Sequence, residues 1–148
     1  MSTRVIGLRV VFGLLAAFVV FSGLDQALGG LFSMGWMDNT VYFEVVNKAK
    51  FLEADNHHRF LGGVWTGLGM FMLISLTDLK KYQMGLNLVL AIVFLGGLAR
   101  FSQLNMEVMV RPGVLWAVIV EVVGMPILYV WLTHTLKQVQ STPVKNEG

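Results

Sequence analysis

The chain has 148 residues, of which 55% are hydrophobic and only 14% are charged, and its formal net charge is +2. Soluble domains carry roughly 25% charged residues, so this composition favours an integral membrane protein with its apolar residues in long blocks. The absence of cysteine excludes disulfides, thiolate metal sites and thiol redox chemistry by the chain itself. No basic stripe with interleaved aromatic residues is present, which argues against nucleic-acid binding.

Four apolar segments predict four membrane-spanning helices, and therefore an all-α fold, a four-helix transmembrane bundle. We place the spans at about residues 5–28, 59–77, 84–104 and 114–135, within a single domain of residues 1–136. The first span is interpreted as retained, because its apolar run is long and no Ala-x-Ala cleavage site follows. The polar tail of residues 137–148 has the composition of a disordered segment.

A long connection, residues 31–58, separates the first two spans and is too polar to cross a membrane. Between Thr40 and Glu53 its apolar residues recur at helical spacing, opposite a polar face. We therefore predict a short amphipathic helix between spans one and two, lying on the membrane surface or packed as a lid over the bundle.

The positive charges predict the orientation of the spans. With four spans, most basic residues fall on one side of the membrane: Arg4, Arg9, Lys80, Lys81, Lys137 and Lys145. Positive residues favour the cytoplasmic side, so both termini are expected there.

Ionisable residues in the outer half of the predicted spans form the candidate site. Such groups are costly in a membrane unless they are paired or hydrated. Two interpretations stay open: a buried ionic clamp that fixes helix order, and an outward-facing polar pocket for an anionic or amphipathic ligand or a proton. Pairing of Arg100 with Glu121 and of Arg59 with Asp25 is one possibility among several. The set, with two neighbouring amides, is Asp25, Arg59, Arg100, Glu121, Gln26 and Gln103.

His57 and His58 are weak candidates for a metal site. Adjacent helical residues point about 100° apart, so the two rings would not bind one metal from one helix face. With Glu53 and Asp55 nearby an interfacial site is conceivable, but capping of the second span by Asp55 or Asn56 is the simpler interpretation. We predict no metal, no cofactor and no catalytic residue.

Glycines within the second and third spans predict close helix–helix contacts, within one chain or between protomers. They are Gly62, Gly63, Gly67, Gly96 and Gly97, and they include the pattern Gly63-x-x-x-Gly67. Gly23-Leu24-Asp25 also closes the first span much as Gly97-Leu98-Ala99-Arg100 closes the third, which is compatible with a duplicated two-helix unit.

Two segments carry a family resemblance: Arg59-Phe60-Leu61-Gly62-Gly63-Val64-Trp65 with a further Gly-x-Gly, and Phe94-Leu95-Gly96-Gly97-Leu98-Ala99-Arg100. Together with Glu121 and Pro126 they resemble an uncharacterised family of small four-span bacterial membrane proteins, a domain of unknown function. The architecture is more distantly similar to DoxX-like four-helix membrane proteins, some of which are subunits of quinone-linked oxidoreductases. The nearer resemblance implies the bacterial inner membrane and transfers no catalytic role.

We therefore expect a non-catalytic membrane protein that acts through helix–helix contacts, as a homo-oligomer or as an accessory subunit of a larger inner-membrane complex. Its expected partners are membrane lipid and other membrane proteins. The alternative is a ligand-binding or transport-type protein that uses the polar pocket, and a quinone-linked redox subunit is a distant third.

Overall fold

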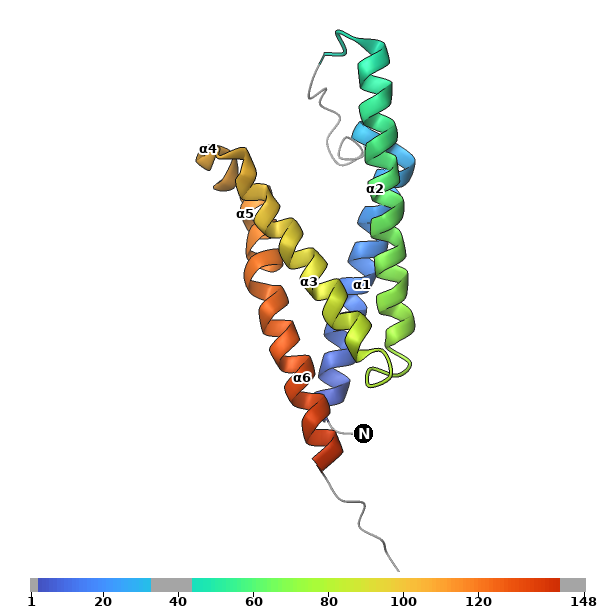
Figure 1. Ribbon diagram of the computed structural model, residues 1–148, viewed down its shortest axis with the longest axis vertical. Helices are drawn as coiled ribbons and strands as arrows, with labels where there is room; N and C mark the ends of the chain where they lie inside the picture. The colour runs from blue at the N-terminus through green and yellow to red at the C-terminus, as the bar shows by residue number, and fades with distance from the viewer. Residues whose placement is uncertain (1–2, 33–43, 142–148) are drawn as a thin grey trace, which may run out of the picture. The chain divides into compact units, whose positions relative to one another are not determined.

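The computed structural model of the chain describes residues 3–32 and 44–141 (Figure 1). Regular structure in these two ranges is entirely helical, which confirms the all-α fold class. The chain divides into two compact units. We call Arg9–Thr77 the N-terminal unit, and Met1–Leu8 together with Asp78–Gly148 the C-terminal unit.

The N-terminal unit is built on two helices, α1 (Thr3–Gly29, counted here from Arg9) and α2 (Lys48–Ser75). A short 3₁₀ turn over residues 30–32 follows α1. Asn47 caps the start of α2, because its side-chain oxygen accepts the backbone N–H of Lys50 at 3.1 Å.

The predicted amphipathic helix is not a separate element where the structure describes it. Its residues from Lys48 onward are the first turns of α2, which continues without a break into the segment predicted as the second span. Neither glycine nor proline interrupts the sequence between Lys48 and Arg59, so nothing ends the helix there. Asp55 is consequently inside α2 and is not its cap. Residues 40–43 lie outside the described residues.

Small residues let α1 and α2 pack backbone to backbone. A Cβ on Gly23 would lie 2.5 Å from the Thr66 nitrogen, and one on Gly62 would lie 2.3 Å from the Ala27 nitrogen. One on Gly69 would lie 2.7 Å from a backbone nitrogen of α1. These clashes with main-chain atoms mean that larger side chains cannot occupy the three positions without separating the helices.

The C-terminal unit begins with the turn after Asp78 and continues through α3 (Gln83–Ala99) and the 3₁₀ helix η2 (Arg100–Gln103). The short helix α4 (Met106–Met109) follows. The chain then returns through three contiguous helical stretches: α5 (Pro112–Val118), the π-helix η3 (Ile119–Gly124) and α6 (Met125–Ser141).

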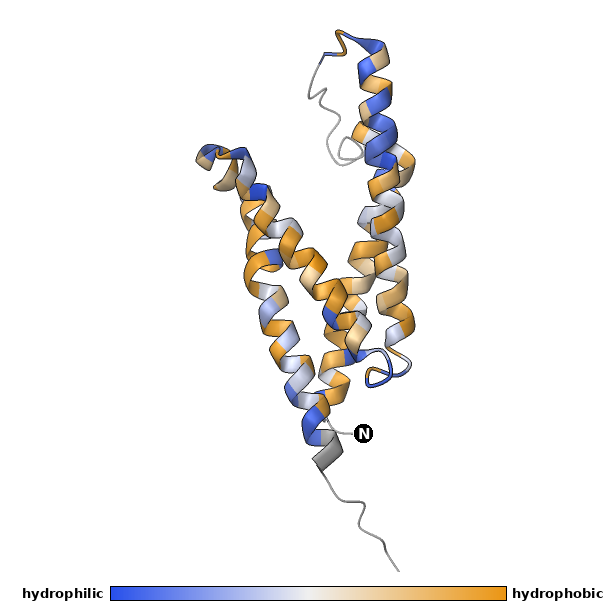
Figure 2. Cartoon of the chain, viewed as in Figure 1, coloured by the Kyte–Doolittle hydropathy of each residue, from blue (hydrophilic) through white to orange (hydrophobic). Residues whose placement is uncertain are grey.

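Three helical stretches are long and apolar enough to cross a membrane: Thr3–Phe32, Gln83–Gln103 and Pro112–Gln138. Figure 2 shows them as mostly hydrophobic, whereas the start of α2 is largely hydrophilic. α2 has the length but not the apolarity, because His58 and Arg59 lie within it and four glycines replace larger apolar side chains. The sequence predicted four membrane-spanning helices, and three helices of the structure are long and apolar enough to cross a membrane.

The two units share details of construction. Gly23 of α1 and Gly97 of α3 are each pressed against the second helix of their own unit. The helix then ends at a left-handed residue, Gly30 (φ 63°) in one unit and Leu104 (φ 51°) in the other. The spacing from Gly23 to Gly97 equals the spacing from Gly30 to Leu104. The end of α1 can therefore be aligned with the end of α3 and η2 without a gap. Buried residues follow it too: Phe12, Ala16 and Val19 in α1, and Leu86, Leu90 and Val93 in α3.

Candidate functional site

Two charged side chains of α2 hold the end of α1. Arg59 donates from Nε to Oδ2 of Asp55 at 2.6 Å. Its Nη1 donates to the carbonyl oxygen of Ala27 at 3.4 Å and also to that of Leu28. Asp55 uses its second oxygen, Oδ1, to accept the backbone N–H of Leu31 at 2.8 Å. We call Asp55 and Arg59 the α1 latch.

The latch pairs backbone groups that the end of a helix leaves without partners. The last carbonyls of α1 carry partial negative charge, and the guanidinium of Arg59 is a suitable cation for them. Gly30, at φ 63°, turns the chain so that the next N–H faces Asp55. A Cβ on Gly30 would lie 2.0 Å from Oδ1 of Asp55, so the position requires glycine for both its backbone angle and its lack of a side chain.

The electrostatics of the latch favour a charged carboxylate. The side chain of Asp55 is only 11% exposed, whereas that of Arg59 is 41% exposed. The hydrogen bond from Arg59, and then the bond from the Leu31 N–H, hold the pKa of Asp55 below its usual value of 3.8 against the opposing effect of burial. Asp55 precedes the predicted second span, and it stays ionised at neutral pH.

A second ion pair closes the C-terminal unit. Arg100 donates from Nε to Oε2 of Glu121 at 2.6 Å and from Nη2 to Oε1 at 2.7 Å. Two parallel bonds of this kind match the fork of a guanidinium to both oxygens of a carboxylate. Gly97 makes room for the pair, because a Cβ there would lie 2.7 Å from the Cβ of Glu121.

A local widening of the helix presents Glu121 to Arg100. Glu121 lies in the π-helix η3, where the N–H of Met125 donates to the carbonyl of Val120, five residues earlier. Pro126 follows and has no N–H to continue the α-helical pattern. A π turn inserts a residue into an α-helix and shifts the direction of its side chains, so η3 sets where Glu121 points.

The pairing suggested for Arg100 and Glu121 is the one seen, whereas the pairing suggested for Arg59 and Asp25 is wrong. Arg59 contacts Asp55 one helical turn earlier. Asp25 is half-buried in α1, and its carboxylate makes no hydrogen bond or ion pair with any other residue of the described ranges. Three of the four predicted charges thus take part in two separate ion pairs, each within its own unit, and Asp55 takes the place predicted for Asp25.

The predicted packing glycines fall into two groups. Gly62 and Gly97 lie in tight contacts, as expected. Gly63, Gly67 and Gly96 face open space, with no neighbour within 4 Å of an added Cβ. The Gly63-x-x-x-Gly67 pattern therefore does not join α2 to α1. The helix turn places Gly62, Thr66 and Gly69 on the α1 side, and the pattern lies off that face.

The remaining predicted site residues, two glutamines and two histidines, form no polar cluster among the residues that the structure describes. Gln26 lies along the α1–α2 contact, with its Cβ 2.8 Å from a Cβ added to Gly62, and Gln103 is exposed in η2. His57 is exposed and His58 is half-buried on α2. Within residues 3–32 and 44–141, no group of three histidine or acidic side chains is arranged to hold a metal ion.

Sequence reasoning missed three positions of this site. Asp55 was assigned a cap or metal role, although its spacing of four from Arg59 is the spacing of a helical ion pair. The polar sequence around Asp55 predicts a helix that begins only after it, which separates Asp55 from Arg59. Gly23 is predicted only as part of a possible repeat and Gly30 only as a helix breaker, and only the packed structure distinguishes them from glycines that face open space.

These features define a small all-α protein with membrane-length helices, in which each unit is fastened by one arginine–carboxylate pair. The chain belongs to a family defined by a domain of unknown function, DUF4345, whose model matches residues 7–132. The predicted membership of an uncharacterised family is thereby confirmed. No curated protein and no solved structure matches the chain significantly.

Proposed function

We propose that this protein is a small, non-catalytic, four-span protein of the bacterial inner membrane that acts through helix–helix contacts, as a homo-oligomer or as an accessory subunit of a larger complex. The observation that carries the proposal is the open face of α2 at Gly63 and Gly67. Glycines four residues apart let two helices approach closely in a lipid environment, where such packing drives association. Gly96 offers a similar bare position on α3.

The charged residues support a structural role more than a catalytic one. Arg59, Asp55, Arg100 and Glu121 are each engaged with protein partners. The groove between α3 and α6 has no charged side chain in its lining, which consists of Asn87, Leu90, Ala91, Phe94, Met125, Pro126 and Tyr129.

The packing of α2 against α1 supports the fourth span. The contact with α1 runs from Asp55 in α2, near Gly30, to Leu76 directly after α2, near Gly13. Along α1 this contact covers about 17 residues, or roughly 25 Å of helix, which approaches the thickness of the hydrocarbon core. If α1 crosses the membrane, α2 crosses beside it. The modest hydropathy of α2 then reflects its glycines, which replace large side chains with close backbone contact.

Single-cysteine labelling tests the topology directly, since the chain has no cysteine of its own. Lys48→Cys and Glu107→Cys should react with a membrane-impermeant maleimide from outside the cell. Lys80→Cys should react only after the membrane is opened. If Lys48→Cys and Lys80→Cys react from the same side, α2 does not cross and the four-span proposal is wrong.

Native mass spectrometry after gentle extraction tests the contact role. The wild-type protein should give a discrete higher mass, either a homo-oligomer or a complex with another protein. Gly63→Leu with Gly67→Leu should shift it to the monomer, whereas Ala91→Leu, an exposed position on α3, serves as the matched control. A monomeric wild-type protein would remove the basis of the proposal.

A second candidate is the ligand-binding or transport-type function, and Asp25 is the observation that favours it. Asp25 is half-buried within a membrane-length helix and lacks an ion-pair partner among the residues described. Unpaired acids at such positions are candidates for proton or ligand contact. Under this alternative, Asp25→Asn leaves the oligomer intact and removes a small-molecule or lipid adduct that the wild-type protein carries in native mass spectrometry. A wild-type protein without any reproducible adduct, or an adduct that Asp25→Asn retains, would contradict this alternative.

A further inference from the structure

We propose that the C-terminal unit binds one anionic phospholipid at the end of α6, with an acyl chain along an apolar groove and the phosphate among Arg4, His134 and Lys137. The site is distinct from both ion pairs. The proposal rests on the membrane placement given under the proposed function and goes beyond it by naming a ligand class.

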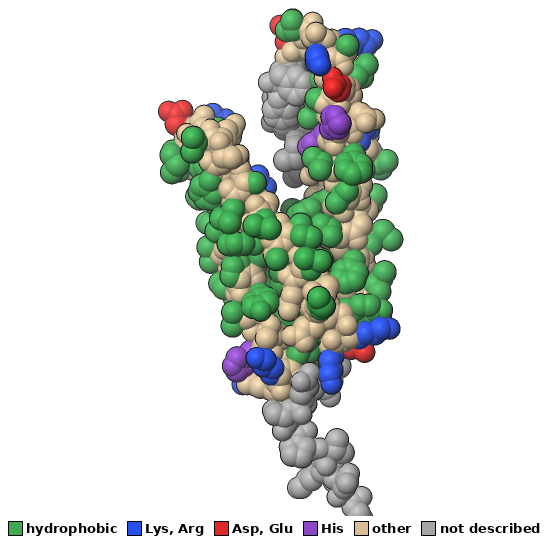
Figure 3. Space-filling view, viewed as in Figure 1, with side chains coloured by type: hydrophobic (Ala, Val, Ile, Leu, Met, Phe, Trp, Pro, Cys, Tyr) green, Lys and Arg blue, Asp and Glu red, His purple; other side chains and the backbone are tan. Residues whose placement is uncertain are grey.

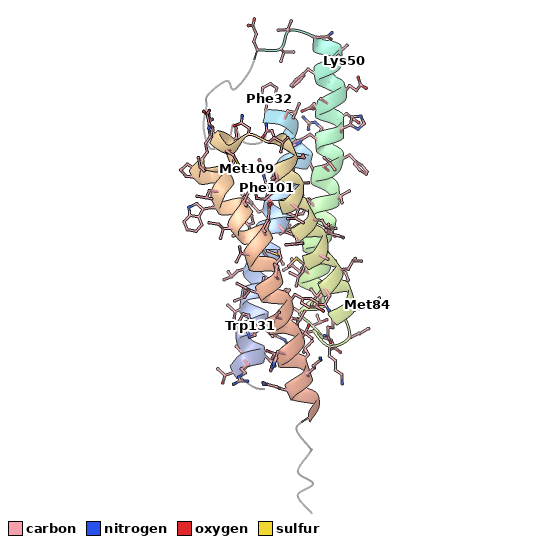
Figure 4. The ribbon with its side chains drawn as sticks, turned by 60° about the vertical axis from the view of Figure 1, so that its left-hand side comes forward. Phe32, Lys50, Met84, Phe101, Met109 and Trp131 are labelled. Carbon is pink, nitrogen blue, oxygen red and sulfur yellow. The ribbon has the colours of Figure 1, made fainter. Side chains whose placement is uncertain are left out.

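An apolar groove runs along α6. Its lining residues are Pro126, Ile127, Val130, Trp131 and His134. From Pro126 to His134 the helix rises about 12 Å, a length that takes much of one acyl chain. Ile127 and Val130 are each about 60% exposed and face this groove. Figure 4 shows Trp131 toward the C-terminal end of α6, and tryptophan is enriched where transmembrane helices meet the membrane interface.

Basic side chains gather where the groove ends. Arg4 donates from Nη1 to the side-chain oxygen of Gln138, and Nε2 of Gln138 lies 3.3 Å from Nδ1 of His134. Gln138 thus bridges the start of α1 to α6, and Lys137 adjoins it in sequence. In the space-filling view, hydrophobic side chains on α6 give way to basic ones and histidine at this end (Figure 3).

Arg4 and Lys137 have no acidic partner among the described residues of the unit. Asp78 uses its carboxylate oxygen to accept the backbone N–H groups of Lys80 and Lys81, at 3.1 Å and 3.0 Å. Glu121 is occupied by Arg100. Positive charge is therefore left uncompensated beside an apolar groove, which is complementary to an anionic headgroup carrying an acyl chain.

Gly7 contributes the contact that holds this end together. A Cβ added to Gly7 would lie 3.6 Å from the Trp131 ring, so the first turns of α1 pack directly on the indole. Arg4 lies one turn before Gly7 on the same helix face. Its position beside Gln138 is thus fixed by packing as well as by the hydrogen bond.

Lipid retention measured by native mass spectrometry tests the site. The protein is exchanged into micelles with equal amounts of phosphatidylglycerol and phosphatidylcholine. Wild-type protein should retain phosphatidylglycerol in preference, and Arg4→Gln with Lys137→Gln should reduce that preference by about five-fold for each cation removed. The matched control, Lys80→Gln with Lys81→Gln, removes the same charge from the same unit and should keep the preference. An equal loss in both double variants, or no preference in the wild type, overturns the proposal.

Fluorescence quenching provides a test that does not depend on charge variants folding. Phosphatidylglycerol with brominated chains should quench the wild-type tryptophan emission more than brominated phosphatidylcholine does. Trp131→Phe should abolish that difference, and persistence of the difference would place the lipid elsewhere. Alkaline carbonate extraction separates the two proposals: release from the membrane contradicts the membrane placement, whereas a retained protein without lipid preference contradicts only this site.

Discussion

A methyl group on Gly30 would lie 2.0 Å from Oδ1 of Asp55, closer than any two such atoms can approach. The glycine and the carboxylate therefore depend on each other. The left-handed turn at Gly30 delivers the Leu31 N–H to Asp55, and Asp55 occupies the space that a side chain at position 30 would need. This contact ends α1 and fastens it to α2.

Gly30→Ala should destabilise the N-terminal unit by more than the roughly 1–2 kcal/mol that a left-handed angle costs an L-residue. The added cost is displacement of Asp55 from the Leu31 N–H. The matched change in the other unit is Leu104→Gly, at φ 51°, which should be neutral or stabilising by about 1 kcal/mol. Thermal unfolding in detergent measures both, and equal effects of the two variants would contradict the argument.

Removal of the Asp55 charge should matter more at neutral than at acidic pH. The folded pKa of Asp55 is depressed below 3.8, so its contribution is fully present above that value and is lost as the pH falls through the folded pKa. Asp55→Asn should therefore unfold at a lower temperature than wild type at about pH 7. The gap should narrow below pH 3.8. Glu53→Gln, an exposed acid of the same helix, provides the control for general acid effects.

Glu121→Gln should destabilise the C-terminal unit by about 1–3 kcal/mol, since it leaves a guanidinium without its carboxylate. Arg100→Gln in the same chain should recover part of the loss, because the unpaired charge is then gone. The double-mutant cycle is measured by thermal unfolding. Additive losses would mean that the pair contributes no coupling, in spite of its two short bonds.

Neighbouring glycines of α2 should respond in opposite ways to the same substitution. Gly62→Leu forces a side chain against the backbone of Ala27 and should cost about 1–3 kcal/mol or more. Gly63→Leu meets no neighbour and improves helix propensity by up to about 1 kcal/mol. Unfolding of the monomeric protein in a dissociating detergent distinguishes them. A large loss for Gly63→Leu would show that its face is covered within the chain.

The sequence was sufficient for the helices but not for their contacts. Apolar runs locate α1, α3 and α6 because lipid-compatible length and composition are properties of single segments. The start of α2 was misplaced because its first turns are polar, and polar residues are compatible with either a loop or a helix projecting from an apolar region. Asp55 and Arg59 can pair across one helical turn only if α2 begins before Asp55. The misplaced helix start therefore also hid this ion pair.

The sequence also does not distinguish the glycines that pack between helices from those that do not. Gly62 and Gly63 are adjacent and chemically identical, and composition gives no reason to prefer either as a packing residue. Only the rotation of α2 about its axis, fixed by its contacts with α1, places one in the interface and leaves the other bare. Arg100 and Glu121 were easier to pair, because charges within apolar segments have few available partners.

The π-helix η3 has a consequence for how the family can vary. A π turn holds one more residue than an α turn, so it is a place where the chain can gain or lose a residue while the helices on either side keep their own packing. Losing that residue would rotate position 121 away from Arg100. Homologues one residue shorter between Trp116 and Pro126 are therefore expected to lack the arginine at position 100 as well, so that length and charge change together in evolution.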